Sequence, residues 1–282
     1  MKIKRWPLFA FAAFLLGLGL MAGCSSLDER QRAWIFQPSD RSWGGGLAAA
    51  EGMDDVWIAF KAPFSGEPAT LHGLWLPAVK PNSPVLLYLH GARYNVTGSA
   101  PRMRRMQELG FSVLAVDYRG FGKSTSALPS EETAYEDARH AWDWLAATYP
   151  DRPRYIFGHS LGGPIAIQLA SEVNDERGTL VEGAFTSIAD VVGTTQWGWM
   201  PVSLLITQRF DAIRRVDKIG SPLLVVHGEN DRLILPSLGR KLYEAAAEPK
   251  LFVLVEGGSH HNTNSVGQVQ YRQALAQLFS LK

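Results

Sequence analysis

The stretch Tyr155-Ile156-Phe157-Gly158-His159-Ser160-Leu161-Gly162-Gly163-Pro164-Ile165-Ala166 decides the fold of this chain. Its apolar start predicts a short buried strand and its end predicts a helix, so a sharp turn carries Ser160 between them. Glycines stand two places before and two places after this serine, as required where a strand and a helix approach closely. A proline in the first helical turn is tolerated, because its missing amide hydrogen has no helical partner. The pattern predicts a serine at a strained strand-to-helix turn.

Predicted strands and helices alternate along the rest of the chain. Two short β-rich runs, residues 56–60 and 70–76, are expected to form an antiparallel pair. Nearly continuous apolar runs, typical of strands buried on both faces of a parallel sheet, follow at residues 85–89, 112–116, 155–157, 181–185, 223–226 and 251–255. Helices are predicted at residues 101–109, 131–148, 161–173, 236–247 and 266–280. The alternation predicts one doubly wound α/β domain over residues 53–282, with a mostly parallel sheet and helices on both faces.

A serine hydroxyl needs a general base to remove its proton and an acidic side chain to orient that base. The strand 223–226 leads into His227-Gly228-Glu229-Asn230-Asp231, where Asp231 is the expected acid. Glu229 and Asp190 are the alternatives for this role. The strand 251–255 leads into a glycine-rich loop with two neighbouring histidines, His260 and His261. One of these two is the expected base.

Acyl transfer also needs two backbone amides that stabilise the developing oxyanion. The residue directly after the nucleophile, Leu161, supplies one amide. The second is expected from the loop after an early strand, and Leu89-His90-Gly91-Ala92-Arg93 fits this position. Because Gly91 lets the backbone approach closely, we assign the second amide to Ala92.

The composition is that of an ordinary globular protein and excludes several function classes. The chain has 282 residues, of which 46% are hydrophobic and 20% charged, and a net charge of +1. Without a basic excess, no nucleic-acid partner is expected. The single cysteine, Cys24, cannot form an internal disulfide, and the sequence holds neither a CxxC pair nor an HExxH motif. We therefore expect no metal site and no cofactor.

The first residues have the pattern of an export signal. Lys2, Lys4 and Arg5 precede an uncharged apolar run over residues 7–27. Met21-Ala22-Gly23-Cys24 resembles the bacterial lipoprotein cleavage box. This resemblance implies a signal peptide over residues 1–23, lipid on Cys24 and an extended arm over residues 24–52. The alternative is an uncleaved anchor, because the uncharged run is long enough to span a bilayer of roughly 30 Å. Either version tethers an exported protein to a membrane of the bacterial cell envelope.

Five motifs carry a resemblance to a known family: His90-Gly91-Ala92, residues 117–124, residues 158–163, residues 227–231 and residues 257–261. Over about residues 54–282 the chain resembles an α/β-hydrolase fold serine hydrolase. It is most similar to the small-lid group with bacterial esterases, lysophospholipase-like enzymes and acyl-protein thioesterases. The order nucleophile, acid, histidine along the chain agrees with that family. The resemblance implies a catalytic triad of Ser160, Asp231 and His260, with His260 favoured over His261, and an oxyanion hole at Ala92 and Leu161.

The resemblance implies a membrane-tethered hydrolase that cleaves carboxylic esters or thioesters through an acyl-enzyme. Its substrate is expected to be a small-molecule or lipid acyl ester. A noncatalytic binding protein of the same fold and a serine peptidase of the same fold are the alternatives. The apolar segment 197–206 stands where this family places its lid, and is either the wall of an acyl pocket or a helix packed on the sheet.

One cluster of charge stands apart from these motifs. Arg102, Arg104 and Arg105 lie close together on the predicted helix 101–109. Such clusters are usually solvated helix faces, so these arginines are expected at the surface.

Overall fold

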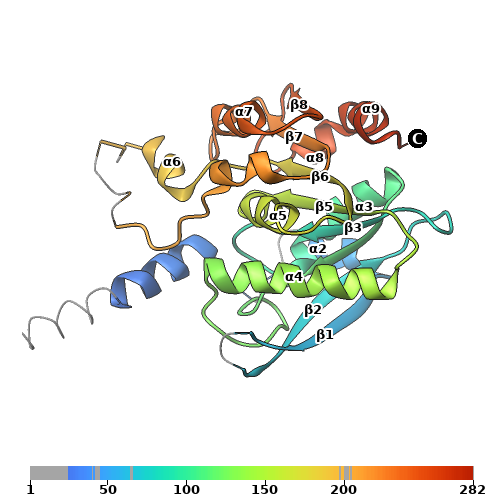
Figure 1. Ribbon diagram of the computed structural model, residues 1–282. Helices are drawn as coiled ribbons and strands as arrows, with labels where there is room; N and C mark the ends of the chain where they lie inside the picture. Colours follow the sequence, from blue (N-terminus) through green and yellow to red (C-terminus); the bar gives the residue numbers. More distant parts are fainter. Residues whose placement is uncertain are drawn as a thin grey trace, which may run out of the picture.

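The computed structural model describes residues 25–39, 41, 45–63, 66–196, 198–199, 203 and 205–281. The expected signal peptide 1–23 and Cys24 lie outside these residues. Eight strands form one sheet with the order β1-β2-β4-β3-β5-β6-β7-β8 (Figure 1). The strands are β1 Asp54–Lys61, β2 Pro68–Leu76, β3 Val85–Leu89, β4 Ser112–Val116, β5 Arg154–His159, β6 Glu176–Glu182, β7 Leu223–Gly228 and β8 Lys250–Val255.

The sheet is parallel except at one edge. Strand β2 runs antiparallel to both β1 and β4, and every other neighbouring pair is parallel. The expected antiparallel pair and the doubly wound α/β fold are therefore confirmed. Strand β3 is followed in the chain by β4 on one side of it, whereas β5 pairs on its other side. At such a change of direction, outside the carboxyl ends of the strands, α/β proteins place their ligands, and here these are the ends of β3 and β5.

Helices cover both faces of the sheet (Figure 1). They are α2 Gly46–Ala50, α3 Ala100–Glu108, α4 Glu131–Thr148, α5 Gly162–Ala170, α6 Ile188–Gly193, α7 Pro236–Ala245, α8 Thr263–Val266 and α9 Gln268–Phe279. One buried core joins the sheet to α4, α5 and α7, and the other joins it to α3 and α9. Strand β3 supplies Val85, Leu87 and Leu89 to the first core, and Leu86 and Tyr88 to the second. A strand whose alternate side chains enter two cores has no polar face, which explains the continuous apolar runs.

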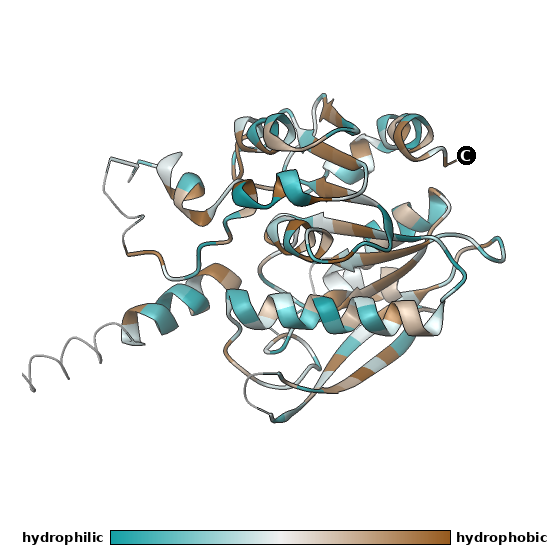
Figure 2. Cartoon of the chain, in the orientation of Figure 1, coloured by the Kyte–Doolittle hydropathy of each residue, from teal (hydrophilic) through white to brown (hydrophobic). Residues whose placement is uncertain are grey.

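Helix α4 shows how sequence sets the helix boundaries. The Ser130 hydroxyl accepts a hydrogen bond from the Thr133 amide at 3.1 Å, and the Ser130 amide donates to the Thr133 hydroxyl at 2.8 Å. This reciprocal cap satisfies amides that have no partner within the helix. Glu131 and Glu132 follow in the first turn, where the helix dipole favours negative charge. Figure 2 shows apolar residues concentrated in the strands and polar residues along the outer side of α4.

The structure differs from the expected extended arm, because residues 25–36 form a helix. Phe36 at its end is fully buried, and its ring lies 5.7 Å from that of Phe210 and 6.4 Å from that of Phe121. The Arg32 Nε donates to the Pro129 carbonyl at 3.0 Å. The sequence prediction treated residues 24–52 as one segment, and the proline and glycines within residues 38–46 favoured a loop over its whole length. Residues 25–36 pack on the domain instead of leading freely away from it.

Strand β6 also differs from its prediction. The sequence predicted residues 181–185, whereas the strand spans Glu176–Glu182. It starts at the polar residues Glu176 and Arg177, which an apolar run cannot reveal. It ends before Gly183, whose φ of 57° no strand residue adopts. Ala184 and Phe185 are still buried, so the apolar run continued beyond the strand.

Among the described residues, no helix has both the length and the apolar composition that crossing a bilayer requires.

Replacing Phe36 with alanine tests whether the helix 25–36 belongs to the domain. Phe36→Ala removes a fully buried ring, and we expect it to lower the free energy of unfolding by about 3–5 kcal/mol. Trp34 on the same helix is 65% exposed, so Trp34→Ala should change it by less than about 0.5 kcal/mol. Urea unfolding of the full chain in detergent measures both values. Equal, small effects would show that the helix contributes nothing to the fold.

Candidate active site

The turn after β5 holds Ser160 in a strained conformation. Its φ is 54°, a left-handed value that residues with a side chain rarely adopt. The Ser160 amide donates to the Glu182 carbonyl at 2.9 Å, and the Ser160 carbonyl accepts from the Gly163 amide at 2.9 Å. These two bonds fix the turn on both sides. The serine side chain is therefore turned away from the sheet at the carboxyl end of β5.

The flanking glycines are required by the space around them. A Cβ on Gly158 would lie 2.1 Å from the Gly162 carbonyl oxygen and 2.7 Å from the Ala166 Cβ. A Cβ on Gly162 would lie 2.0 Å from the Leu89 carbonyl oxygen. No side chain fits at either position without moving backbone. The glycines let α5 start against β5 and β3, as the sequence predicted.

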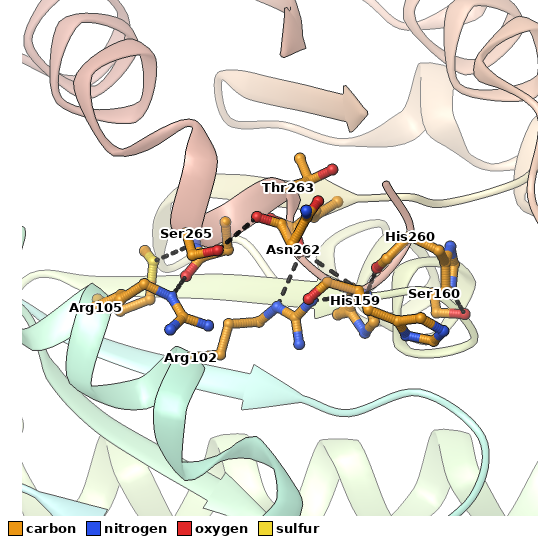
Figure 3. Close-up of polar contacts among 12 residues, drawn as sticks. Arg102, Arg105, His159, Ser160, His260, Asn262, Thr263 and Ser265 are labelled. Carbon is orange, nitrogen blue, oxygen red and sulfur yellow. Dashed lines mark hydrogen bonds and ion pairs between the residues drawn. The ribbon is translucent and has the colours of Figure 1, made fainter. Parts of the chain in front are cut away.

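The structure brings Ser160, His260 and Asp231 together. His260 Nε2 lies 2.9 Å from Ser160 Oγ (Figure 3). The His260 Nδ1 lies 2.7 Å from Asp231 Oδ2. An ionised carboxylate only accepts hydrogen bonds, so Nδ1 carries the proton of the neutral ring. Nε2 is then an acceptor, and the serine hydroxyl donates to it. This is the arrangement in which an imidazole can remove the serine proton.

Asp231 is a buried carboxylate with many donors around it. Its Oδ1 accepts from the amides of Leu233 and Ile234 at 3.0 and 2.9 Å, and His227 Nε2 lies 3.4 Å from its Oδ2. Burial alone would raise the pKa of Asp231, but hydrogen bonds from His227, His260 and the Ile234 amide outweigh it and hold that pKa well below its usual value. The carboxylate therefore stays charged at neutral pH, ready to orient the imidazole of His260.

The alternative acids and the alternative base have other surroundings. Glu229 is exposed, and its carboxylate accepts from the Gly257 amide at 3.3 Å. Asp190 lies in the first turn of α6 and accepts from the Thr186 hydroxyl at 2.5 Å. His261 is exposed, with its ring centroid 5.4 Å from that of His260. Of the two histidines, His260 is the one within hydrogen-bond distance of Ser160.

Leu161 directly follows Ser160 in the chain, and Ala92 lies in the loop after β3. A Cβ on Gly91 would be 3.0 Å from the Ser160 Cβ, so the loop after β3 runs directly against the serine. Within the described part of the chain, neither the Ala92 amide nor the Leu161 amide donates to a protein acceptor. Two amides without protein partners beside a nucleophile could bind a developing oxyanion.

Two supporting residues were missed by the sequence analysis, Arg102 and Glu182, and both contact His159, whose position next to Ser160 already indicates a supporting role. His159 Nε2 lies 3.1 Å from the His260 carbonyl oxygen. Arg102 was expected on a solvated helix face, but its side chain is only 11% exposed and its Nε donates to Glu182 at 2.9 Å. Arg104 and Arg105 also have protein partners, the Ala49 carbonyl and the Asn264 side chain. The expected solvated face is therefore wrong, because the acceptors come from segments distant in sequence.

Other polar residues near the site have structural partners. Asp117 accepts from the Val96 amide at 2.7 Å, and His227 donates to the Ile234 carbonyl at 2.8 Å. Among the residues that the structure describes, no group of three or more His, Cys, Asp or Glu side chains could hold a metal ion. The expected apolar lid is described only in part, since Trp197, Met200 and Leu204 lie outside the described residues. Trp199 and Leu205 are exposed.

Comparisons with known proteins agree with this architecture. Residues 80–198 match the family described as "Serine aminopeptidase, S33". An uncharacterised protein of Mycobacterium tuberculosis is 33% identical over 195 residues, which are 68% of each chain. The lysophosphatidylserine lipase ABHD12 of Rattus norvegicus is 31% identical over 194 residues, which are 62% of this chain and 48% of that lipase. The chain therefore spans about half the length of the ABHD12 relative.

Solved structures share the fold. An esterase of Pyrococcus furiosus superposes with a TM-score of 0.67 and 19% identity, covering 86% of this chain and 96% of the esterase. At this identity the likeness establishes the fold alone.

Adding a methyl group at Gly158 tests the tight packing of the turn. Gly158→Ala places a Cβ against backbone, and we expect it to lower the free energy of unfolding by roughly 3 kcal/mol. Gly220→Ala is the matched control, because nothing lies within 4 Å of its Cβ position. It should leave stability within about 1 kcal/mol of the native chain. Unfolding curves of the two variants give the comparison, and a stable Gly158→Ala protein would contradict the described packing.

Proposed function

From the premise that the chain belongs to the α/β-hydrolase family, we propose that it hydrolyses carboxylic ester or thioester bonds through an acyl-enzyme. The observation that carries the proposal is the continuous chain from Ser160 through His260 to Asp231, with contacts of 2.9 and 2.7 Å. A noncatalytic protein of this fold would not need a strained serine bonded to an oriented imidazole. The catalytic alternative is therefore favoured over the binding protein.

In the proposed reaction, His260 Nε2 takes the proton of Ser160 as Oγ bonds to the acyl carbon. The carbonyl oxygen becomes an oxyanion that the amides of Ala92 and Leu161 stabilise. His260 then gives its proton to the leaving alcohol or thiol as the bond to the acyl carbon breaks. Water attacks the acyl-serine, with His260 accepting its proton. His260 then returns this proton to Ser160 Oγ as the bond to the acyl carbon breaks, and the carboxylic acid is released. Asp231 stabilises the imidazolium and keeps the ring in its required orientation.

Lipid or small-molecule acyl esters are the proposed substrate class. Support comes from the names of the relatives, which include a lysophosphatidylserine lipase and an esterase. The exposed apolar residues Trp199 and Leu205, in the segment expected to be the lid, are compatible with an acyl chain. The match to a family described as a serine aminopeptidase favours a peptidase as the second candidate, since the same triad cleaves amides. Parallel assays with esters and aminoacyl amides distinguish the two.

Tethering of the protein to a membrane of the cell envelope through lipid on Cys24 is part of the proposal. Support comes from the sequence before Cys24 and from the helical residues 25–36, which follow Cys24 in the chain and pack on the domain. Gln31 on this helix donates to the Leu205 carbonyl at 2.7 Å, so it also contacts the expected lid segment. Lipid on Cys24 would therefore hold the catalytic domain close to the bilayer.

Substitution of the triad residues tests the proposed chemistry. Using a short p-nitrophenyl ester, we expect Ser160→Ala and His260→Ala to lower kcat by at least about 10³-fold, because nucleophile and base act as one unit. Asp231→Asn should lower kcat by up to about 10⁴-fold through loss of imidazole orientation. Steady-state kinetics on the full chain in detergent measure these effects.

The controls come from the neighbouring positions. His261→Ala and Glu229→Gln should retain kcat within about threefold, because the observed contacts to Ser160 Oγ and Asp231 Oδ2 are made by His260. Loss of turnover in His261→Ala with activity kept in His260→Ala would reverse the assignment of the base. A dominant effect of Glu229→Gln over Asp231→Asn would transfer the acid role.

Mass spectrometry of the membrane fraction tests the lipid anchor. We expect a mature chain that begins at Cys24 and carries the added mass of acyl groups. Cys24→Ser should abolish that mass, because the thiol is the group that accepts lipid. An amino terminus at Met1, or unmodified Cys24 in a soluble mature form, would refute the lipoprotein proposal.

A further inference from the structure

A largely buried ion pair lies next to the segments that carry the triad. Arg102 from α3 donates through Nε to Glu182 Oε1 at 2.9 Å, and the two side chains are 11% and 1% exposed. The hydroxyl of Tyr271 from α9 donates to the other oxygen of Glu182. Both oxygens of the carboxylate are therefore bonded. The pair links three elements that are distant in sequence.

One end of this ion pair contacts Ser160, and the other contacts the residue next to His260. Glu182 is the last residue of β6, and its backbone carbonyl accepts from the Ser160 amide at 2.9 Å. Arg102 Nη2 lies 3.3 Å from the carbonyl oxygen of His261, the neighbour of His260. One residue pair thus contacts both the turn that carries the nucleophile and the loop that carries the base.

His159 fills the space between Arg102 and the histidine loop. Its Nε2 lies 3.1 Å from the His260 carbonyl oxygen and 3.2 Å from Arg102 Nη2. Burial and the positive charge of Arg102 hold the pKa of His159 well below its usual value, so the ring is neutral. Since Arg102 only donates, Nε2 can serve one of these two contacts at a time. The His261 carbonyl therefore faces a donor of Arg102 in either state, and the His260 carbonyl faces a donor when His159 Nε2 carries the proton.

The contacts with Arg102 and His159 add to the local hydrogen bonds of the histidine loop, such as that from the Ser259 amide to Asn262 Oδ1 at 2.6 Å. The loop follows Gly257 and Gly258, and Gly257 has a φ of 69°, so its entry is conformationally permissive. His260 must nevertheless keep Nδ1 on Asp231 and Nε2 on Ser160 at the same time. A displacement of about 1 Å in such a geometry can lower the rate about 10²-fold.

We propose that Arg102, held by its ion pair with Glu182, is a positioning residue that fixes the His261 carbonyl and thereby aims His260 at Ser160. The proposal rests on the proposed serine hydrolase function. Arg102 touches neither the substrate nor the reacting atoms. Its effect is therefore on the rate of acylation, while substrate binding is left unchanged.

The test uses a variant that removes both charges, because an unpaired charge left in this site would itself destabilise the fold. In Arg102→Met/Glu182→Gln we expect kcat for a short p-nitrophenyl ester to fall about 10- to 100-fold, with KM within about twofold of wild type. The low-field proton resonance of His260 Nδ1 should broaden or disappear as the ring loses its fixed orientation. Arg102→Lys keeps the positive charge but lacks the planar guanidinium group with its several donors. Its kcat should therefore lie between that of the wild type and that of the double variant.

Arg104→Met is the matched control. Arg104 lies on the same helix, but it bonds the carbonyls of Ala49 and Glu51, on the side of α3 that faces α2. We expect wild-type kcat, KM and histidine resonance in this variant. Urea unfolding of every variant identifies those that remain folded at the assay temperature.

The outcomes separate this proposal from the proposed function. An inactive wild-type protein would refute the serine hydrolase itself. An active wild type with equal kcat in the folded double variant, or an equal loss of kcat in Arg104→Met, would overturn the role of Arg102. If the double variant does not fold, Arg102→Lys decides. Wild-type kcat together with an unchanged Nδ1 resonance in that variant would overturn the proposal as well.

Discussion

The left-handed backbone of Ser160 is the constraint on which the rest of the structure depends. A residue with a side chain adopts this conformation only where its surroundings compensate for the strain. Here the compensation comes from hydrogen bonds of Ser160 to Glu182 and Gly163 and from the close approach of α5 to β5 and β3. That approach is possible only because Gly158 and Gly162 lack side chains. The left-handed turn therefore accounts for the two glycines around Ser160. It also places the serine hydroxyl at the edge of the sheet.

The parallel sheet brings the partners of this serine to the same edge. Strands β3, β5, β7 and β8 all end there, and the loops after them carry Ala92, Ser160, Asp231 and His260. Residues far apart in the sequence thus lie close together because the parallel strands before them end at the same edge. Behind them, the ion pair of Arg102 and Glu182 connects the nucleophile turn to the histidine loop. The triad residues carry the proposed chemistry, and the ion pair is proposed to keep them in position.

The sequence predicted those features that local patterns encode. Apolar runs located β3 and β4 at their observed boundaries, and the glycines around Ser160 marked the turn. Strand β6 was misplaced because it begins with the polar residues Glu176, which is buried, and Arg177, which is exposed, so no apolar run marks its start. Arg102 was expected in solvent because its acceptors, Glu182 and the His261 carbonyl, are 80 and 159 residues away. Such tertiary pairs leave no periodic signal in a single sequence.

The central claim is that Ser160 is an activated nucleophile, and site mapping of a covalent adduct tests it most directly. The wild-type protein would be treated with a fluorophosphonate, digested and analysed by tandem mass spectrometry. The account predicts one adduct on the peptide that contains Ser160, formed faster than on the unfolded chain, because only the folded protein holds His260 2.9 Å from the hydroxyl. A folded protein that forms no adduct, or one that carries it on another residue, would contradict the account.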